Sequence, residues 1–149
     1  MKISTKGRYG LRAMMDLAVN SGGDHISLNS IAQRQNVSEN YLEHVFSMLR
    51  KAGLVKSVKG AQGGYILAKS PSNMTVGMIL RALEGELSVI DENSERSANE
   101  YGSVQYCLKK YVWDKINESI NRVVDSITLE SLAEEYRKMN GSRVPMFYI

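Results

Sequence analysis

The stretch V37-S-E-N-Y-L-E-H-V-F-S-M-L-R-K-A-G53 decides which fold this sequence predicts. Leu42, Val45, Phe46 and Leu49 recur at i, i+3, i+4 and i+7, the spacing of one face of an α-helix. Ser38 stands where an N-cap oxygen meets the first free backbone amides. By itself, the segment fits an ordinary amphipathic surface helix.

The opposite face of this helix is polar and carries Asn40, Glu43, His44, Ser47 and Arg50. Asn40 and Glu43 lie near the N-terminus, which is the end that a recognition helix inserts into the major groove of DNA. The preceding residues 27–35 have the pattern of a short helix capped by Ser27, and a tight polar turn follows them. Two short helices joined in this way predict a helix-turn-helix, although short helical hairpins are common.

After Gly53 the hydrophobic period changes from helical to alternating. Residues 54–59 and 65–68 have the pattern of two strands, and G60-A-Q-G-G64 has that of the turn between them. A β-hairpin directly after a recognition helix is the order of a winged helix. Lys56 and Lys59 lie toward the tip, where glycines let the backbone approach DNA closely; the alternative is a plain hairpin turn.

Two more helices are expected around this motif, at residues 6–20 and 75–84. The start of the first is dense in cations, including Lys6 and Arg8, and Tyr9 follows Arg8 directly. Cations destabilise a helix N-terminus through the macrodipole, so phosphate contacts offer a reason for their position. A solvated helix end is the alternative.

The last third of the chain contains a long amphipathic pattern from about Val104 to Ser126. Its apolar row is Leu108, Val112, Ile116, Ile120, Val123 and Ile127. Little of the chain is left to cover a row of this length, so we expect it to pair with a second copy. Packing onto its own domain is the alternative. A last short helix is expected at residues 129–138.

Charge is distributed unevenly along the 149 residues, although the net charge is only +3. Residues 1–70 contain ten Lys/Arg and four Asp/Glu, a formal charge of +6, and residues 71–149 carry −3. A basic first half indicates a polyanionic partner. We find no nucleophile–base pair, metal-ligand spacing or phosphate-binding loop, so an enzyme is not expected. No signal core or apolar run of about 18 residues is present, which favours the cytosol.

Three motifs together resemble the Rrf2 family of bacterial winged-helix transcription regulators. They are M1-K-I-S-T-K-G-R-Y-G-L-R-A-M14, S38-E-N-Y-L-E43 and L49-R-K-A-G-L-V-K-S-V-K-G-A-Q-G-G-Y65, and the long helix follows them. The resemblance covers essentially the whole chain. It implies that the recognition helix reads bases, the wing enters the minor groove and the long helix forms a homodimer. The implied DNA-binding residues are Lys6, Arg8, Tyr9, Ser38, Asn40, Tyr41, Glu43, Lys56, Lys59, Gly60, Gln62, Gly63 and Gly64.

Some members of this family bind an iron–sulfur cluster through three closely spaced cysteines before the long helix and a fourth ligand elsewhere. This chain has only Cys107, and one thiolate cannot hold a [2Fe–2S] cluster, which needs about four ligands. We therefore expect no cofactor and no metal. Cys107 is either a half-buried structural cysteine or an oxidation sensor at the start of the long helix.

The absence of cluster ligands leaves the branch of the family that represses cysteine-metabolism genes without a cluster. Those proteins sense the metabolic state through cysteine synthase, an enzyme that accepts C-terminal peptides ending in isoleucine. The resemblance therefore implies that Met146, Phe147, Tyr148 and Ile149 form a docking tail. A tail that packs on its own subunit or on the second subunit is the alternative.

The expected fold is mainly α, a winged helix-turn-helix domain with a long C-terminal dimerisation helix. We expect residues 1–87 to form the DNA-binding domain, 88–103 a linker, and 104–149 the dimerisation helix and tail. The expected function is a homodimeric repressor of cysteine and sulfur genes on palindromic operators. The alternatives are a redox or nitrosative-stress regulator sensing through Cys107 and an interaction adaptor that no longer binds DNA.

Overall fold

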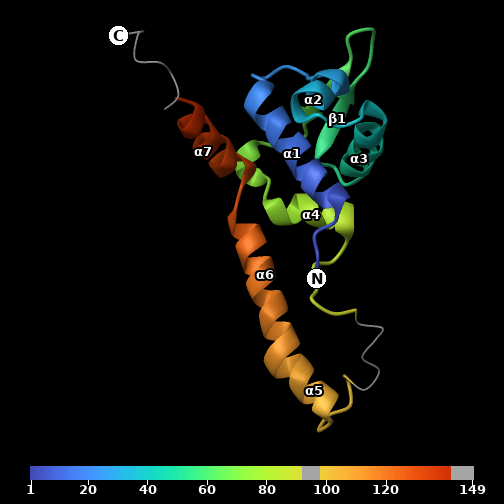
Figure 1. Cartoon of the computed structure of the whole chain (residues 1–149), viewed down its shortest axis with the longest axis vertical. Coiled ribbons are helices and arrows are strands. Elements are labelled where there is room, and N and C mark those ends of the chain that lie inside the picture. Colours follow the sequence, from blue (N-terminus) through green and yellow to red (C-terminus); the bar gives the residue numbers. More distant parts are fainter. Residues whose placement is uncertain (92–97, 142–149) are drawn as a thin grey trace.

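The computed structural model describes residues 1–91 and 98–141 of the chain (Figure 1). Three helices open the chain: α1 (Thr5–Asn20), α2 (Leu28–Gln35) and α3 (Glu39–Lys51). The hydroxyl oxygens of Ser4, Ser27 and Ser38 each accept a hydrogen bond from an amide in the first turn of the helix that follows. The predicted helices and the predicted caps at Ser27 and Ser38 are confirmed.

The turn between α2 and α3 depends on one residue with left-handed backbone geometry. Asn36 has a φ of 55°, and asparagine tolerates this conformation better than most residues that carry a Cβ. The Val37 amide donates back to the carbonyl of Ala32 over 3.0 Å, which closes the end of α2. The chain therefore reverses within three residues, and Ser38 immediately caps α3.

The hairpin consists of β1 (Val55–Val58) and β2 (Gly64–Leu67), which pair antiparallel with Val55 opposite Leu67. A further bridge joins β2 to the loop before α2. In this bridge the Ile26 amide donates to the Tyr65 carbonyl over 3.0 Å, and the Tyr65 amide donates to the Ile26 carbonyl over 2.8 Å. The wing is thus fastened to the helical body by backbone hydrogen bonds.

One core joins the four N-terminal helices, the fourth being α4 (Val76–Glu84). The predicted stripe of α3 is completely buried in it, and helices α1, α2 and α4 supply most of the other side chains. The largest fully buried residues are Phe46, Met14, Leu17, Ile31, Leu42, Leu49, Met74, Ile79, Leu83 and Leu129. The mainly helical fold with a winged helix-turn-helix order is as predicted.

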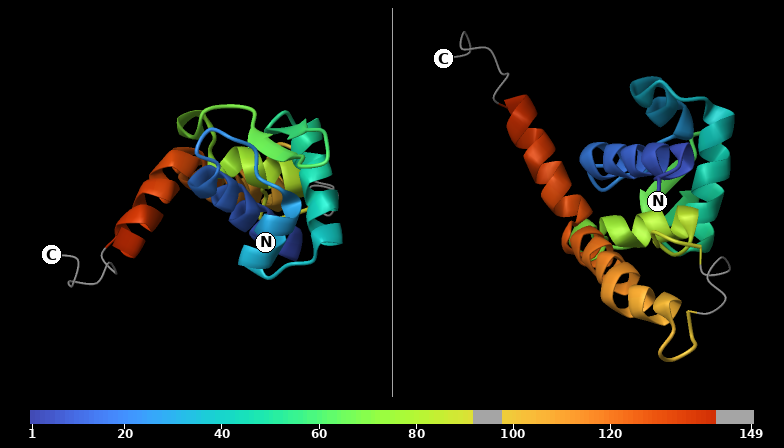
Figure 2. Two further views of the ribbon diagram at one scale, coloured as in Figure 1. Left: turned by 90° about the horizontal axis from the view of Figure 1, so that it is seen from above. Right: turned by 60° about the horizontal axis from the view of Figure 1, so that its bottom comes forward.

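The long helix spans Val104 to Ser126 as predicted, but it is not a regular α-helix. A π-helical turn (Lys109–Trp113) separates α5 (Val104–Leu108) from α6 (Asp114–Ser126). The Lys109 ammonium donates to the Asp114 carboxylate over 3.1 Å across this wider turn. Figures 1 and 2 show α5 and α6 as a rod that projects from the helical body. Among the described residues, none of the helices combines the length and apolar character needed to cross a membrane.

A polar clamp fixes the rod to α4. Arg81 donates to both carboxylate oxygens of Asp125, over 2.7 and 2.8 Å, and to the Asn121 side-chain oxygen over 2.6 Å. The hydrogen bond from Arg81 lowers the pKa of Asp125, and the same bond raises the pKa of Arg81. Because the carboxylate pKa is lowered in the folded state, the clamp stabilises the fold at neutral pH and is lost as the pH falls through that lowered pKa.

The predicted dimerisation row is divided between two environments. Ile120 and Ile127 pack beside Val76, Leu80 and Leu87 of their own chain, which is the alternative considered for the whole row. Ile127 lies beyond the helix, in extended backbone, and this corrects its place in a helical row. The exposed members are Leu108, Ile116 and Val123, whereas Val112 is half-buried.

The chain then crosses to α7 (Leu129–Gly141), which lies beside α1 (Figure 2). Leu129 is fully buried in the main core. A residue of the expected dimerisation segment, 104–149, therefore contributes to the core of the expected DNA-binding domain, 1–87. The Val76 amide donates to the Ile127 carbonyl over 2.9 Å, and the Leu129 amide donates to the Met74 carbonyl over 2.8 Å. The predicted tail, residues 146–149, lies outside the described residues.

Gly64 is required by close packing, because a Cβ at this position would overlap the backbone carbonyl of Ile26. We expect Gly64→Ala to lower the free energy of unfolding by about 1–3 kcal/mol, since one of the two backbones must shift. Urea denaturation followed by circular dichroism measures this change. Gly141→Ala is the matched control, because a Cβ there meets open space. Equal stability of the two variants would contradict the proposed close approach.

Candidate nucleic-acid interface

The first two turns of α3 present an exposed polar face opposite the buried stripe. Asn40, Glu43 and His44 are exposed, and Tyr41 is half-buried at one edge of this face. The Ser38 hydroxyl accepts from the Tyr41 amide over 3.0 Å, which leaves its own O–H free to donate. An asparagine amide can pair with adenine, and a carboxylate can accept from the amino group of cytosine. This face therefore has suitable chemistry for contacts with base edges.

One edge of the face lies against the start of α1. The ring of Tyr9 meets the ring of Tyr41 edge to face, with 6.1 Å between centroids. The guanidinium carbons of Arg12 and Arg8 lie 4.8 and 5.9 Å from the centroid of the Tyr9 ring. The structure thus brings the predicted residue Tyr9 next to α3, with Arg8 beside the Tyr9 ring, and Lys6 lies half-buried in the same first turns of α1.

Glu84, the last residue of α4, holds the N-terminus of α1 in place. One of its carboxylate oxygens accepts from the Ser4 amide over 2.5 Å and also from the Ser4 hydroxyl. A carboxylate at a helix N-terminus is favoured by the macrodipole. Glu84 thus places a negative charge at this helix end, which Lys6 and Arg8 do not supply.

The other edge of the face opens into a cleft of about 610 Å³ between α3, the start of α2 and the wing. Glu39 and Glu43 line its helical side, and Gly60, Gly63 and Gly64 line its wing side. Of the predicted DNA-binding residues, Glu43, Gly60, Gly63 and Gly64 therefore line one concave surface.

The wing tip is held by backbone contacts. Gly60 has a φ of 126°, which a residue with a side chain rarely adopts, and its carbonyl accepts from the Gly63 amide over 3.1 Å. The Gln62 carbonyl contacts the His25 imidazole. Lys56 and Lys59 are exposed on the hairpin, as expected for groups that meet phosphates.

Sequence reasoning missed two residues that shape this interface. Asn29 lines the cleft and donates to the Glu39 carboxylate over 3.2 Å. His25, in the loop before α2, contacts the wing through the Gln62 carbonyl. Their proximity to α3 and to the wing arises from the tertiary fold, and no local sequence pattern signals it.

Cys107 lies on the rod and is exposed, which corrects the expectation of a half-buried structural cysteine. In residues 1–91 and 98–141, no three side chains of His, Cys, Asp or Glu are grouped so that they could hold a metal ion. An iron–sulfur cluster needs about four ligands, and the sequence contains one cysteine. The donor set of this chain does not fit such a cluster.

Residues 3–135 match the Rrf2 family model, described as "Iron-dependent Transcriptional regulator". The HTH-type transcriptional regulator CymR of Bacillus subtilis is 47% identical over 133 residues, which is 89% of this chain and 90% of that protein.

Two solved structures are similar over nearly the whole chain. The structure of CymR, described as the global cysteine regulator of B. subtilis, has a TM-score of 0.74 and 46% identity, covering 91% of this chain and 98% of that one. The structure of T. potens IscR has a TM-score of 0.74 and 44% identity, covering 99% of this chain and 95% of that one.

Proposed function

The chain belongs to the Rrf2 family of DNA-binding transcriptional regulators, and we propose that it is a cytoplasmic homodimeric repressor that binds palindromic operators without an iron–sulfur cluster. It is not an enzyme. The observation that carries the proposal is the exposed face of α3, with Tyr9 and Arg8 along one edge and the wing along the other. In this proposal Asn40 and Glu43 contact bases, and the cations of α1 and the wing contact phosphates.

The proposed dimer rests on the exposed apolar side chains of the rod. Tyr111, Val123 and Leu108 of the rod are 58%, 57% and 42% exposed, so three large apolar side chains are left uncovered in the single chain. A second copy of the rod would cover them and would duplicate the α3 face. Two such faces related by a twofold axis would match the two halves of a palindrome.

The proposed targets are genes of cysteine and sulfur metabolism. The proposal rests on the similarity to CymR, whose structure is described as that of a global cysteine regulator. It also rests on the single cysteine, because a regulator without cluster ligands needs another source of signal. Sensing of oxidation by the exposed Cys107 is the alternative.

We expect Glu43→Ala and Lys59→Ala to weaken DNA binding in different ways. Glu43→Ala should reduce the preference for a selected operator over a scrambled duplex by about 5- to 150-fold, as expected for loss of one base contact. Lys59→Ala should weaken binding to both duplexes alike and reduce the salt slope by about 1, because one phosphate contact is lost. Fluorescence anisotropy between 50 and 200 mM salt, about the range in which such contacts change affinity most, measures both.

Lys138→Ala is the control for this experiment, because it removes the same charge from an exposed position on α7. It should leave both the preference and the salt slope unchanged. Binding by the wild-type protein that does not depend on ionic strength would contradict direct recognition of DNA and would favour the adaptor alternative.

We expect Val123→Glu to convert the dimer to a monomer, since pairing would bury an unpaired carboxylate among apolar side chains. Sedimentation velocity measures the mass. Val123 is 57% exposed in the single chain, so the variant should fold, and its helical circular dichroism should match that of the wild type. A Val123→Glu protein that sediments as a dimer would exclude this face as the interface.

The proposal includes cysteine synthase as a partner that binds residues 146–149. Deleting these four residues should abolish capture of purified cysteine synthase in a pull-down, because the apolar side chains that would dock are then absent. The mass of the dimer is the control. In the deletion variant it should decrease only by the mass of the deleted residues. Capture that persists without residues 146–149 would rule out this docking site.

A further inference from the structure

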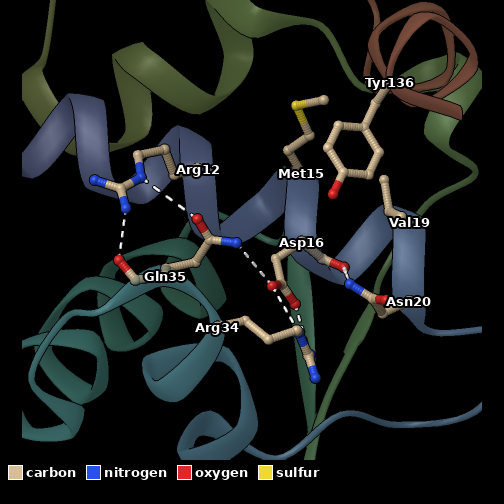
Figure 3. A pocket seen from close by; sticks show the side chains of 8 residues that line it. All are labelled: Arg12, Met15, Asp16, Val19, Asn20, Arg34, Gln35 and Tyr136. Atoms are coloured by element: carbon tan, nitrogen blue, oxygen red, sulfur yellow. Dashed lines mark hydrogen bonds and ion pairs between the residues drawn. The ribbon is translucent and has the colours of Figure 1, made fainter. Parts of the chain in front are cut away.

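A pocket of about 370 Å³ lies between α1, α2 and α7, separate from the cleft beside the wing. Figure 3 shows the side chains that line it, with the Tyr136 ring reaching from α7 toward the residues of α1. The aliphatic side chains of Met15 and Val19 form part of its wall. Its volume lies within the range of pockets that bind small molecules, about 300–1,000 Å³.

One acidic group lines the pocket, and its hydrogen bonds are made within the protein. The Asp16 carboxylate accepts from the Arg34 guanidinium over 2.7 and 2.9 Å and from the Gln35 amide over 2.9 Å. Asp16 is only 5% exposed, so burial strengthens this ion pair. The charges of the buried Asp16 and the partly exposed Arg34 therefore compensate each other.

Arg12 is the remaining charge at the pocket, and within the described part of the chain no carboxylate pairs with it. Its guanidinium donates to the Gln35 backbone carbonyl over 2.5 Å and to the Gln35 side-chain oxygen over 3.4 Å, both of which are neutral acceptors. The pocket thus combines an apolar wall, an aromatic ring and one uncompensated guanidinium. This combination suits a small organic anion, since guanidinium binds carboxylates in a planar, two-point geometry.

Arg12 is also linked to the DNA-reading face by two short routes. It holds the carbonyl of Gln35, which precedes the left-handed Asn36 and the start of α3. It also stacks on Tyr9, whose ring packs against Tyr41 in the first turn of α3. A ligand that draws the guanidinium away from the Gln35 carbonyl would disturb both contacts.

We propose that this pocket binds a small organic carboxylate and that binding lowers DNA affinity by withdrawing Arg12 from Gln35 and Tyr9. The second half of the proposal rests on the proposed DNA-binding function, and the first half does not. Arg12 has two arrangements in this proposal, one in contact with Gln35 and Tyr9 and one withdrawn from them. The ligand can lower DNA affinity only by as much as it binds the withdrawn arrangement more tightly than the other.

The first test is binding of benzoate to the full-length protein, followed by amide NMR spectra. Benzoate should shift the amide signals of Arg12, Gln35 and Tyr136 to saturation, whereas uncharged benzamide should bind at least about ten-fold more weakly, because it lacks the charged acceptor. Equal binding of benzamide and benzoate would overturn the assignment to a carboxylate. So would benzoate shifts confined to α3 and the wing.

Two variants test the residues of the site. Arg12→Met keeps most of the aliphatic stem and should weaken benzoate binding by at least about ten-fold. Tyr136→Ala, at an exposed position that can change without unfolding the protein, should also weaken it. Arg137→Met removes a charge from the next residue of α7, which does not line the pocket, and should bind benzoate like the wild type. Unchanged benzoate binding by both Arg12→Met and Tyr136→Ala would overturn the site.

The second test measures affinity for a selected operator with and without saturating benzoate, at one ionic strength set with sodium chloride. Benzoate should weaken DNA binding by the wild type about five-fold or more and should have no effect on Arg12→Met. If benzoate has no effect on the wild type and Arg12→Met alone reduces the salt slope by about 1, Arg12 is a phosphate contact and the coupling is wrong. If the wild type does not bind DNA but benzoate binds the pocket, the proposed function fails and the ligand site stands.

Discussion

Complete burial of one face of α3 is the constraint on which the rest of the structure depends. Leu42, Val45, Phe46 and Leu49 are all 0% exposed, and each contributes about 1.5–3 kcal/mol when buried. Rotating α3 until all four were exposed would cost on the order of 6–12 kcal/mol, which is comparable to the whole stability of a small domain. The rotation of α3 is therefore fixed, and the opposite face, with Asn40 and Glu43, must point outward.

Polar contacts then fix what surrounds that face. The bidentate pair of Asp16 and Arg34 joins α1 to the end of α2, so the turn into α3 starts from a defined position. Glu84 holds the start of α1. The clamp of Arg81 and Asp125 sets the direction of the rod relative to the helical body. Each of these contacts links two neighbouring elements. Together they fix the directions in which the exposed side chains of those elements point.

The sequence predicted most of the elements because their signals are local. Caps at Ser27 and Ser38, the helical period of the α3 stripe and the glycines of the wing act within a few residues of where they occur. The π-helical turn was missed because it follows an amphipathic pattern that a regular helix also satisfies. The division of the apolar row was missed for a different reason: Ile120 and Ile127 pack on α4, which is about 40 residues away in the sequence.

By itself, the sequence determined the order of the elements, the polar face of α3 and the lack of cluster ligands, because periodicity, capping and composition are properties of the chain. Only the tertiary structure decided that Tyr9 lies against Tyr41, that His25 supports the wing and that Arg12 faces a pocket beneath α7. Tyr9 and Tyr41 are 32 positions apart, His25 and Gln62 are 37 apart, and Arg12 and Tyr136 are 124 apart. Their relative geometry is fixed by how the buried faces pack together. The stretch from Val37 to Gly53 therefore defined a helix with two chemically distinct faces, and packing against α1, α2 and α4 buried one face in the core and left the other exposed.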